Sequence, residues 1–175
     1  MPGLHALHIL LADDNQHMRA ITSAILQSAG VRNIREVADG TMALDALRSR
    51  DIDLAIVDFN MAPMDGLEFT RLVRNSPDSV NPHLPIIMMT GHSERSRVLE
   101  ARDAGVTEFV VKPITGKAIF DRIEAVIMRP RAFVKTEDYF GPDRRRKSSA
   151  TYEGPLRRES DHALDDADLS DSSAA

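Results

Sequence analysis

The chain alternates between two hydrophobic periods, and this alternation constrains its fold more than any other feature. Short runs that are apolar throughout are typical of buried parallel strands, and the segments between them have the spacing of amphipathic helices. Such alternation predicts an α/β fold with a parallel sheet and right-handed crossovers. The expected strands cover residues 7–12, 33–38, 54–59, 84–90 and 108–111, and the second, which contains Arg35 and Glu36, suits a sheet edge.

Each expected strand is followed by an expected helix. Apolar residues spaced for one helix face run from Met18 to Leu26, and Gly30 then supplies a helix stop. Ser93 is expected to cap the fourth helix and Thr115 the fifth. The apolar positions of the second, third and fifth helices are Met42, Leu44, Leu47, Leu67, Leu72, Val73, Ile119, Ile123 and Ile127.

Composition limits the class of protein. The chain has 175 residues, 42% of them hydrophobic, which suits one globular domain and a tail. Its net charge of −5 argues against a surface built to bind nucleic acid or anionic membrane, and the lack of cysteine excludes disulfides and thiolate metal sites. The chain has neither a cationic leader nor an apolar run of about 20 residues, so we expect a cytoplasmic protein without membrane insertion.

The composition changes near Arg129. Residues 129–175 contain few aliphatic side chains and many Arg, Asp, Ser, Gly and Pro. Such a stretch buries too little apolar surface to offset its ordering entropy, so a largely disordered tail is expected. The predicted organisation is therefore a domain over residues 1–128 and a flexible charged tail over residues 129–175.

Polar side chains lie at or directly after the carboxyl ends of four of the five expected strands. Asp13 and Asp14 come directly after the first, Asp58 ends the third, Thr90 ends the fourth and Lys112 follows the fifth. Since the carboxyl ends of parallel strands meet at one edge of a sheet, where ligands bind, these side chains should converge.

The converging residue types suit phosphoryl transfer. Three close carboxylates repel one another, and Mg²⁺, which prefers oxygen ligands, removes that penalty. A carboxylate can attack a phosphoryl group and hold it as an acyl phosphate. The Lys112 ammonium and the Thr90 hydroxyl then supply the positive charge and the donor that the phosphoryl oxygens require.

Five short motifs in this order resemble the receiver domain of two-component response regulators, over about residues 5–128. They are Leu-Ala-Asp-Asp-Asn at 11–15, Ile-Val-Asp-Phe-Asn-Met at 56–61, Met-Asp-Gly at 64–66, Met-Thr-Gly at 89–91 and Val-Lys-Pro at 111–113. The resemblance implies a flavodoxin-like, doubly wound five-stranded sheet of order 2-1-3-4-5 with five helices. Chemotaxis receivers share this strand order. It also implies a single-domain, chemotaxis-regulator-like protein.

The resemblance assigns roles to individual residues. Asp58 matches the phosphoacceptor, and Thr90 and Lys112 match the two residues that contact the phosphoryl oxygens. The implied Mg²⁺ ligands are Asp13, Asp14, Asp58 and the backbone carbonyl of Asn60. Phe109 matches an aromatic that, with Thr90, switches position on phosphorylation, and a cis bond is expected at Lys112–Pro113.

The chain departs from the family at the loop after Asp58, where Ala62 stands in the place of a usual proline and Pro63 follows. Simpler interpretations stay open for several residues. Asp13 and Asp14 could cap the first helix, and Phe109 could be a core residue only. His92, two residues after Thr90, is a further hypothesis as a side chain that borders the site.

The implied function is that of a response regulator, not an enzyme beyond self-catalysed phosphotransfer and dephosphorylation. Its expected partners are a sensor histidine kinase or histidine phosphotransfer protein and a downstream protein, with a phosphorylation-dependent homodimer as a further option. DNA binding is not expected. A phosphohydrolase is disfavoured because Asn60 stands where such an enzyme typically has a second Asp.

The tail leaves a second interpretation open. It contains two copies of Tyr-x-Gly-Pro-x-Arg-Arg, which begin at Tyr139 and Tyr152. The arginine pairs could bind carboxylates or phosphates, so the tail could bind nucleic acid or another protein as the output. A solvated linker is the alternative.

Overall fold

A computed structural model describes residues 3–49, 51–91 and 95–144. Five strands form one parallel sheet in the order β2-β1-β3-β4-β5, which confirms the predicted fold class and strand order. The strands are β1 (His8–Ala12), β2 (Asn33–Val37), β3 (Leu54–Asp58), β4 (Ile86–Thr90) and β5 (Glu108–Val111). Strands β3 and β4 are buried along their whole length, whereas β2 lies at an edge and is mostly exposed, as its charged residues predict.

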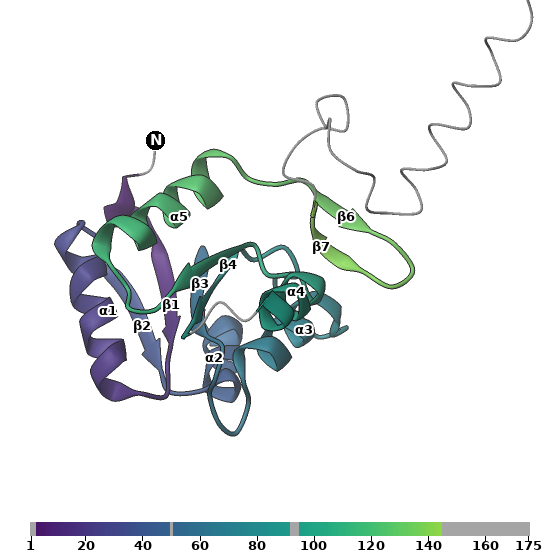
Figure 1. The fold of residues 1–175 in the computed structure, drawn as a ribbon, viewed down its shortest axis with the longest axis horizontal. Coiled ribbons are helices and arrows are strands. Elements are labelled where there is room, and N and C mark those ends of the chain that lie inside the picture. The colour runs from purple at the N-terminus through teal and green to yellow at the C-terminus, as the bar shows by residue number, and fades with distance from the viewer. Residues whose placement is uncertain (1–2, 50, 92–94, 145–175) are drawn as a thin grey trace, which may run out of the picture. The chain divides into compact units, whose positions relative to one another are not determined.

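Five α-helices cover the two faces of the sheet, and a short 3₁₀ helix (Leu4–Ala6) precedes β1. The helices are α1 (Gln16–Ser28), α2 (Gly40–Ser49), α3 (Gly66–Asn75), α4 (Arg95–Ala104) and α5 (Gly116–Met128). Helices α1 and α5 lie on one face, and α2, α3 and α4 lie on the other (Figure 1). The resulting three layers leave the carboxyl ends of the strands accessible at one edge.

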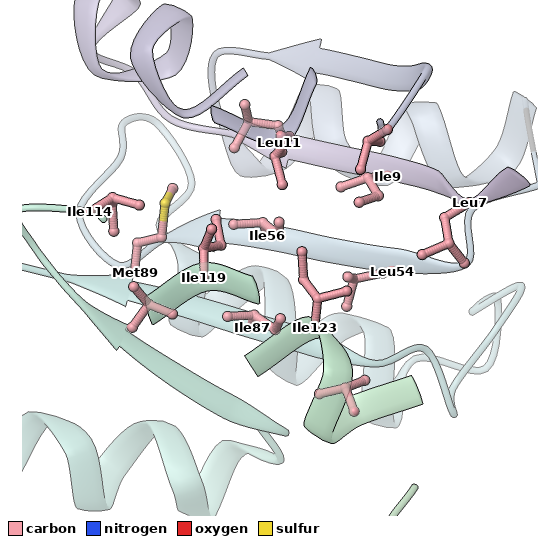
Figure 2. Close-up of a cluster of buried hydrophobic side chains, with 14 residues drawn as sticks. Leu7, Ile9, Leu11, Leu54, Ile56, Ile87, Met89, Ile114, Ile119 and Ile123 are labelled. Atoms are coloured by element: carbon pink, nitrogen blue, oxygen red, sulfur yellow. The ribbon is translucent and has the colours of Figure 1, made fainter. Parts of the chain in front are cut away.

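Both faces of the sheet are packed with aliphatic side chains. On the α1–α5 face, alternate residues of β1, β3 and β4 pack against Ile119 and Ile123 of α5 (Figure 2). On the other face, Phe69 of α3 is fully buried with side chains of α2 and β3. These two apolar layers hold the central strands, and therefore their carboxyl ends, in fixed positions.

Helix ends follow the local sequence. Asn15, rather than Asp13 or Asp14, caps α1, because its Oδ1 accepts hydrogen bonds from the amides of His17 and Met18 at 3.0 and 3.2 Å. The simpler interpretation of the two aspartates as helix caps is therefore wrong. Thr115 caps α5 as predicted, Gly30 follows α1 with a φ of +94°, and Ser93 lies outside the described residues.

The structure differs from the sequence analysis over residues 129–144. A hairpin of β6 (Phe133–Lys135) and β7 (Phe140–Pro142) follows α5, and the compact unit extends to Arg144 rather than ending at residue 128. The hairpin is ordered by aromatic rings, since Phe133 and Phe140 both pack on His83 in the α3–β4 loop. Residues 145–175, with the second copy of the tail motif, lie outside the described part of the chain.

Within the described ranges, no helix is both long enough and apolar enough to cross a membrane.

Candidate functional site

Three carboxylates meet at the carboxyl edge of the sheet, as the strand ends predict. One oxygen from each of Asp13, Asp14 and Asp58 lies within 4.8 Å of the others. The Asp13 side chain is fully buried and that of Asp58 is 8% exposed, whereas Asp14 is exposed to solvent. The cluster is therefore a site with two inner carboxylates and one that faces water, a donor set that suits a hard divalent cation such as Mg²⁺.

Lys112 connects the two inner carboxylates. Its Nζ lies 2.9 Å from Asp58 Oδ1 and 3.3 Å from Asp13 Oδ2. Burial opposes the charge on this ammonium, but the hydrogen bond to Asp58 and the charges of both carboxylates outweigh it and raise the pKa of Lys112. The lysine is consequently cationic at neutral pH.

Asp58 is held in an environment that disfavours its charged form. Burial, the largest influence, and the nearby charges of Asp13 and Asp14 raise its pKa, although Lys112 acts in the opposite direction. A cation placed among the three carboxylates would relieve the same repulsion. The site thus has an electrostatic reason to take up a positive charge.

The loop after β1 is fixed by its backbone. The Asp13 amide donates to the carbonyl of Val37 at 3.2 Å, and Asp13 Oδ1 accepts from the Asn15 amide at 2.9 Å. Arg19 of α1 donates to the Asp13 carbonyl at 2.6 Å and forms an ion pair with Glu36 at 3.5 Å. The Asn15 amide thus orients the carboxylate of Asp13, and the other contacts fix the position of its backbone.

The loop after β3 folds back closely on Asp58. The Gly66 amide donates to the Phe59 carbonyl at 3.0 Å, and a Cβ at Gly66 would collide with the carbonyl oxygen of Asp58. Only glycine therefore allows α3 to begin so close to the site. The Ala62–Pro63 bond in this loop is cis, at the place where the sequence departs from the family pattern.

Asn60 is exposed, and its side chain is engaged by α4. Asn60 Oδ1 accepts from Arg97 Nη1 at 3.0 Å, and the Arg97 guanidinium carbon lies 5.0 Å from the centroid of the Phe59 ring. The sequence alone does not reveal this contact, because a single arginine on a helix of irregular pattern looks like an ordinary solvated residue. A role of the Asn60 carbonyl as a metal ligand stays a prediction.

The remaining predicted residues lie around this cluster. Thr90 is buried at the end of β4, and Lys112 follows β5, with a cis bond to Pro113 as the resemblance implies. Phe109 is half-buried and packs against a small apolar cluster that includes Met88 of β4, Leu67 of α3 and Ala101 of α4. Its switching role stays a prediction, and His92 lies outside the described residues.

The fold and the site together define a class of signalling protein. The model of the response regulator receiver domain matches residues 9–124, so the chain belongs to this family and is a two-component response regulator. It is similar to the chemotaxis protein CheY of Pseudomonas aeruginosa, with 38% identity over 123 residues, which cover 70% of this chain and 98% of that protein. It is also similar to the chemotaxis protein CheY-3 of Vibrio cholerae, with 33% identity over 123 residues, which cover 70% of this chain and 93% of the relative.

Solved structures agree with this assignment. The chemotaxis protein CheY4 of Vibrio cholerae matches with a TM-score of 0.63 and 32% identity, over 69% of this chain and 99% of that one. The receiver domain of the sensor histidine kinase PA1611 of Pseudomonas aeruginosa matches with a TM-score of 0.63 and 25% identity, over 70% of this chain and 98% of that one. That second structure holds a magnesium ion coordinated in its active site cleft.

Proposed function

We propose that this response regulator accepts a phosphoryl group on Asp58, in the presence of Mg²⁺, and signals through contacts with other proteins. The observation that carries the proposal is the pairing of Asp58 with Lys112 at 2.9 Å inside a cluster of three carboxylates. The donor would be a phosphohistidine of a sensor histidine kinase or of a histidine phosphotransfer protein.

The transfer requires an ionised Asp58. A carboxylate oxygen of Asp58 forms the new P–O bond while the P–N bond of the donor histidine breaks, and the imidazole keeps the electron pair of that bond. A magnesium ion held by Asp13, Asp14 and Asp58 would neutralise the carboxylates and the phosphoryl oxygens. Asp58 is then in its charged form despite the burial that raises its pKa.

Lys112 and Thr90 hold the transferred group. Lys112 pairs with Asp58 before transfer, and its ammonium afterwards attracts the phosphoryl oxygens. Thr90 supports the proposal by its position, because it ends β4, the strand next to β3, at the same edge of the sheet as Asp58. The Thr90 hydroxyl donates to the phosphoryl group, and Phe109 turns inward to complete the switch.

The test is direct phosphorylation with a small donor such as acetyl phosphate, followed by mass spectrometry. We expect the phosphorylated peptide to contain Asp58, and we expect no incorporation in Asp58→Asn or in the presence of a chelator. Asp53→Asn is the matched control, because Asp53 lies near the start of the same strand and is about half exposed. Incorporation that persists in Asp58→Asn would contradict the proposal.

The alternative that the arginine-rich tail binds nucleic acid or another protein is a second proposal for the output. It rests on the two tail motifs, and binding to nucleic acid would weaken steeply with salt. A comparison of the full chain with a chain that ends at Arg144 separates the two outputs. Binding that is unchanged by this truncation would contradict the tail hypothesis.

A further inference from the structure

Two elements of the domain reach from the carboxylate cluster to the C-terminal hairpin. Strand β5 is followed by Lys112, which pairs with Asp58, and it begins at Glu108. Glu108 Oε1 lies 2.7 Å from Nη2 of Arg131, which lies two residues before β6. Helix α4 carries Arg97, bonded to Asn60, near its first turn, and Asp103 in its last turn.

The tail motif that begins at Tyr139 binds the last turn of α4. Arg144 Nη1 lies 3.4 Å from Asp103 Oδ1, and the Arg144 guanidinium carbon lies 3.7 Å from the centroid of the Tyr139 ring. The Tyr139 hydroxyl in turn donates to the Pro142 carbonyl at 2.7 Å. Tyrosine, proline and arginine of the motif thus form one unit that is built around an ion pair to α4.

Glycine is required at the centre of this contact. A Cβ at Gly141 would lie 2.9 Å from the Cα of Gly105, the residue that follows α4, and 2.8 Å from Cζ of Tyr139. Gly105 has a φ of +100°, which side chains rarely adopt, and a Cβ there would lie only 3.0 Å from the Phe140 carbonyl oxygen. Two glycines therefore allow the backbones of the hairpin and of the α4–β5 loop to touch.

The hairpin is anchored on its other side by α3 and the α3–β4 loop. The ring of Phe133 lies 5.1 Å from the guanidinium carbon of Arg74, and the His83 ring lies 4.8 Å from Phe133 and 5.1 Å from Phe140. The hairpin consequently contacts α3 and α4, beside which it lies in Figure 1, and Arg131 next to it pairs with the first residue of β5.

We propose that residues 131–144 are an autoinhibitory strap, which holds α4 and β5 in the arrangement in which Lys112 pairs with Asp58 and Arg97 with Asn60. This inference rests on the proposed function. The contacts of the strap are formed while Lys112 is paired with Asp58 and Arg97 with Asn60. If a phosphoryl group on Asp58 shifts α4 and β5, it moves the surfaces that Arg131, Gly141 and Arg144 bind.

Strap docking and phosphorylation therefore oppose each other. Such coupling is reciprocal. A phosphoryl group on Asp58 weakens docking of the strap by a certain factor, and docking of the strap disfavours the phosphorylated conformation by the same factor. The partner-binding form would be reached more easily when the strap is released. In this proposal, the motif residues Tyr139, Gly141, Pro142 and Arg144 serve to dock the strap on α4 and the α4–β5 loop.

The experiment is amide hydrogen exchange on the full chain in Mg²⁺, with and without beryllofluoride, which mimics the phosphoryl group. The reporting amides are those of Thr136 and Asp143, which donate to the carbonyls of Tyr139 and Ala132 at 2.8 and 2.7 Å. We expect beryllofluoride to accelerate their exchange at least about 5-fold, the lower end of ordinary coupling between sites. Amides of β3 report whether the domain stays folded.

Two variants test the reciprocal effect. Arg144→Ala removes the ion pair with Asp103, and Gly141→Ala forces the hairpin away from Gly105. Both should increase the apparent affinity for beryllofluoride at fixed Mg²⁺ by about the factor seen in exchange. Lys135→Ala is the matched control, because this side chain lies in the same hairpin and is exposed.

The outcomes separate the strap from the function. Changes near Asp58 and α4 with unaltered exchange in the hairpin would overturn the strap and leave the proposed function intact. Slower exchange in the hairpin would also overturn it, because docking would then favour the phosphorylated state. Absence of any response to beryllofluoride, with the domain folded, would contradict the proposed function itself, and the strap with it.

Discussion

Arg74 is the charged residue whose removal should cost the fold most. It is 3% exposed, and its guanidinium donates to the carbonyls of Gly105 at 3.0 Å, Pro82 at 2.8 Å and Leu84 at 2.7 Å. Burial lowers the pKa of Arg74 to about 10, which leaves the side chain charged at neutral pH. One side chain thus fixes the end of α3, the α3–β4 loop and the α4–β5 loop.

The perturbation is Arg74→Met, which keeps most of the apolar length and removes all three donors. A buried acceptor without its donor costs roughly 1–3 kcal/mol, so three acceptors set a range of about 3–9 kcal/mol. The folded parent also bears the cost of desolvating a guanidinium. Methionine avoids this cost, which offsets part of the lost free energy of unfolding. We therefore expect the free energy of unfolding to fall by about 3 kcal/mol, at the low end of the range.

The assay is urea unfolding of the full chain, followed by circular dichroism. With a slope of about 2 kcal/mol/M, a loss of about 3 kcal/mol lowers the midpoint by about 1.5 M. Arg71→Met is the matched control, because Arg71 lies on the same helix and its ion pair with Glu100 is about half exposed. The control should lose less than about 1 kcal/mol. Equal effects of the two substitutions would refute the argument.

Three further predictions concern the site. In EDTA at pH 7, Asp58→Asn should be more stable than the parent. Burial raises the pKa of Asp58, so the parent loses stability as the pH rises from 3.8 through that raised pKa. The difference in urea midpoint between the two proteins should therefore disappear in acid. Mg²⁺ at ten times its dissociation constant should stabilise the parent by about 1.4 kcal/mol in thermal or urea unfolding, and Asp13→Asn should abolish this gain, whereas an equal gain in the variant would exclude Asp13 as a ligand. Thr90→Ala should still be phosphorylated by acetyl phosphate but should not transmit the change to Phe109, as monitored by ¹⁹F-NMR of fluorophenylalanine; a normal response would remove Thr90 from the switch.

Much of the fold could be predicted from local sequence, since hydrophobic period reports burial directly. The runs that became β3 and β4 are apolar because both faces of the strands are covered by helices. The convergence of Asp13, Asp58 and Lys112 followed from their places at strand ends. In these cases the strand order of a parallel sheet is enough to say which residues come together.

The hairpin and Arg74 could not be predicted in the same way. Phe133 and Phe140 are separate aromatics in a polar stretch, and their partner His83 lies fifty or more positions earlier in the chain. Arg74 looks like a solvated helix residue until the loops that supply its three carbonyls are in place. Contacts of this kind depend on tertiary packing, which no period in the sequence reports.

The central claim is that a phosphoryl group on Asp58 changes the conformation of the domain. The most direct measurement is a set of amide NMR spectra of the full chain in Mg²⁺, with and without beryllofluoride, for the parent and for Asp58→Asn. We predict shifts around Asp58, Thr90 and Phe109 in the parent and none in the variant. Unchanged spectra of the folded parent, or equal shifts in the variant, would contradict the account.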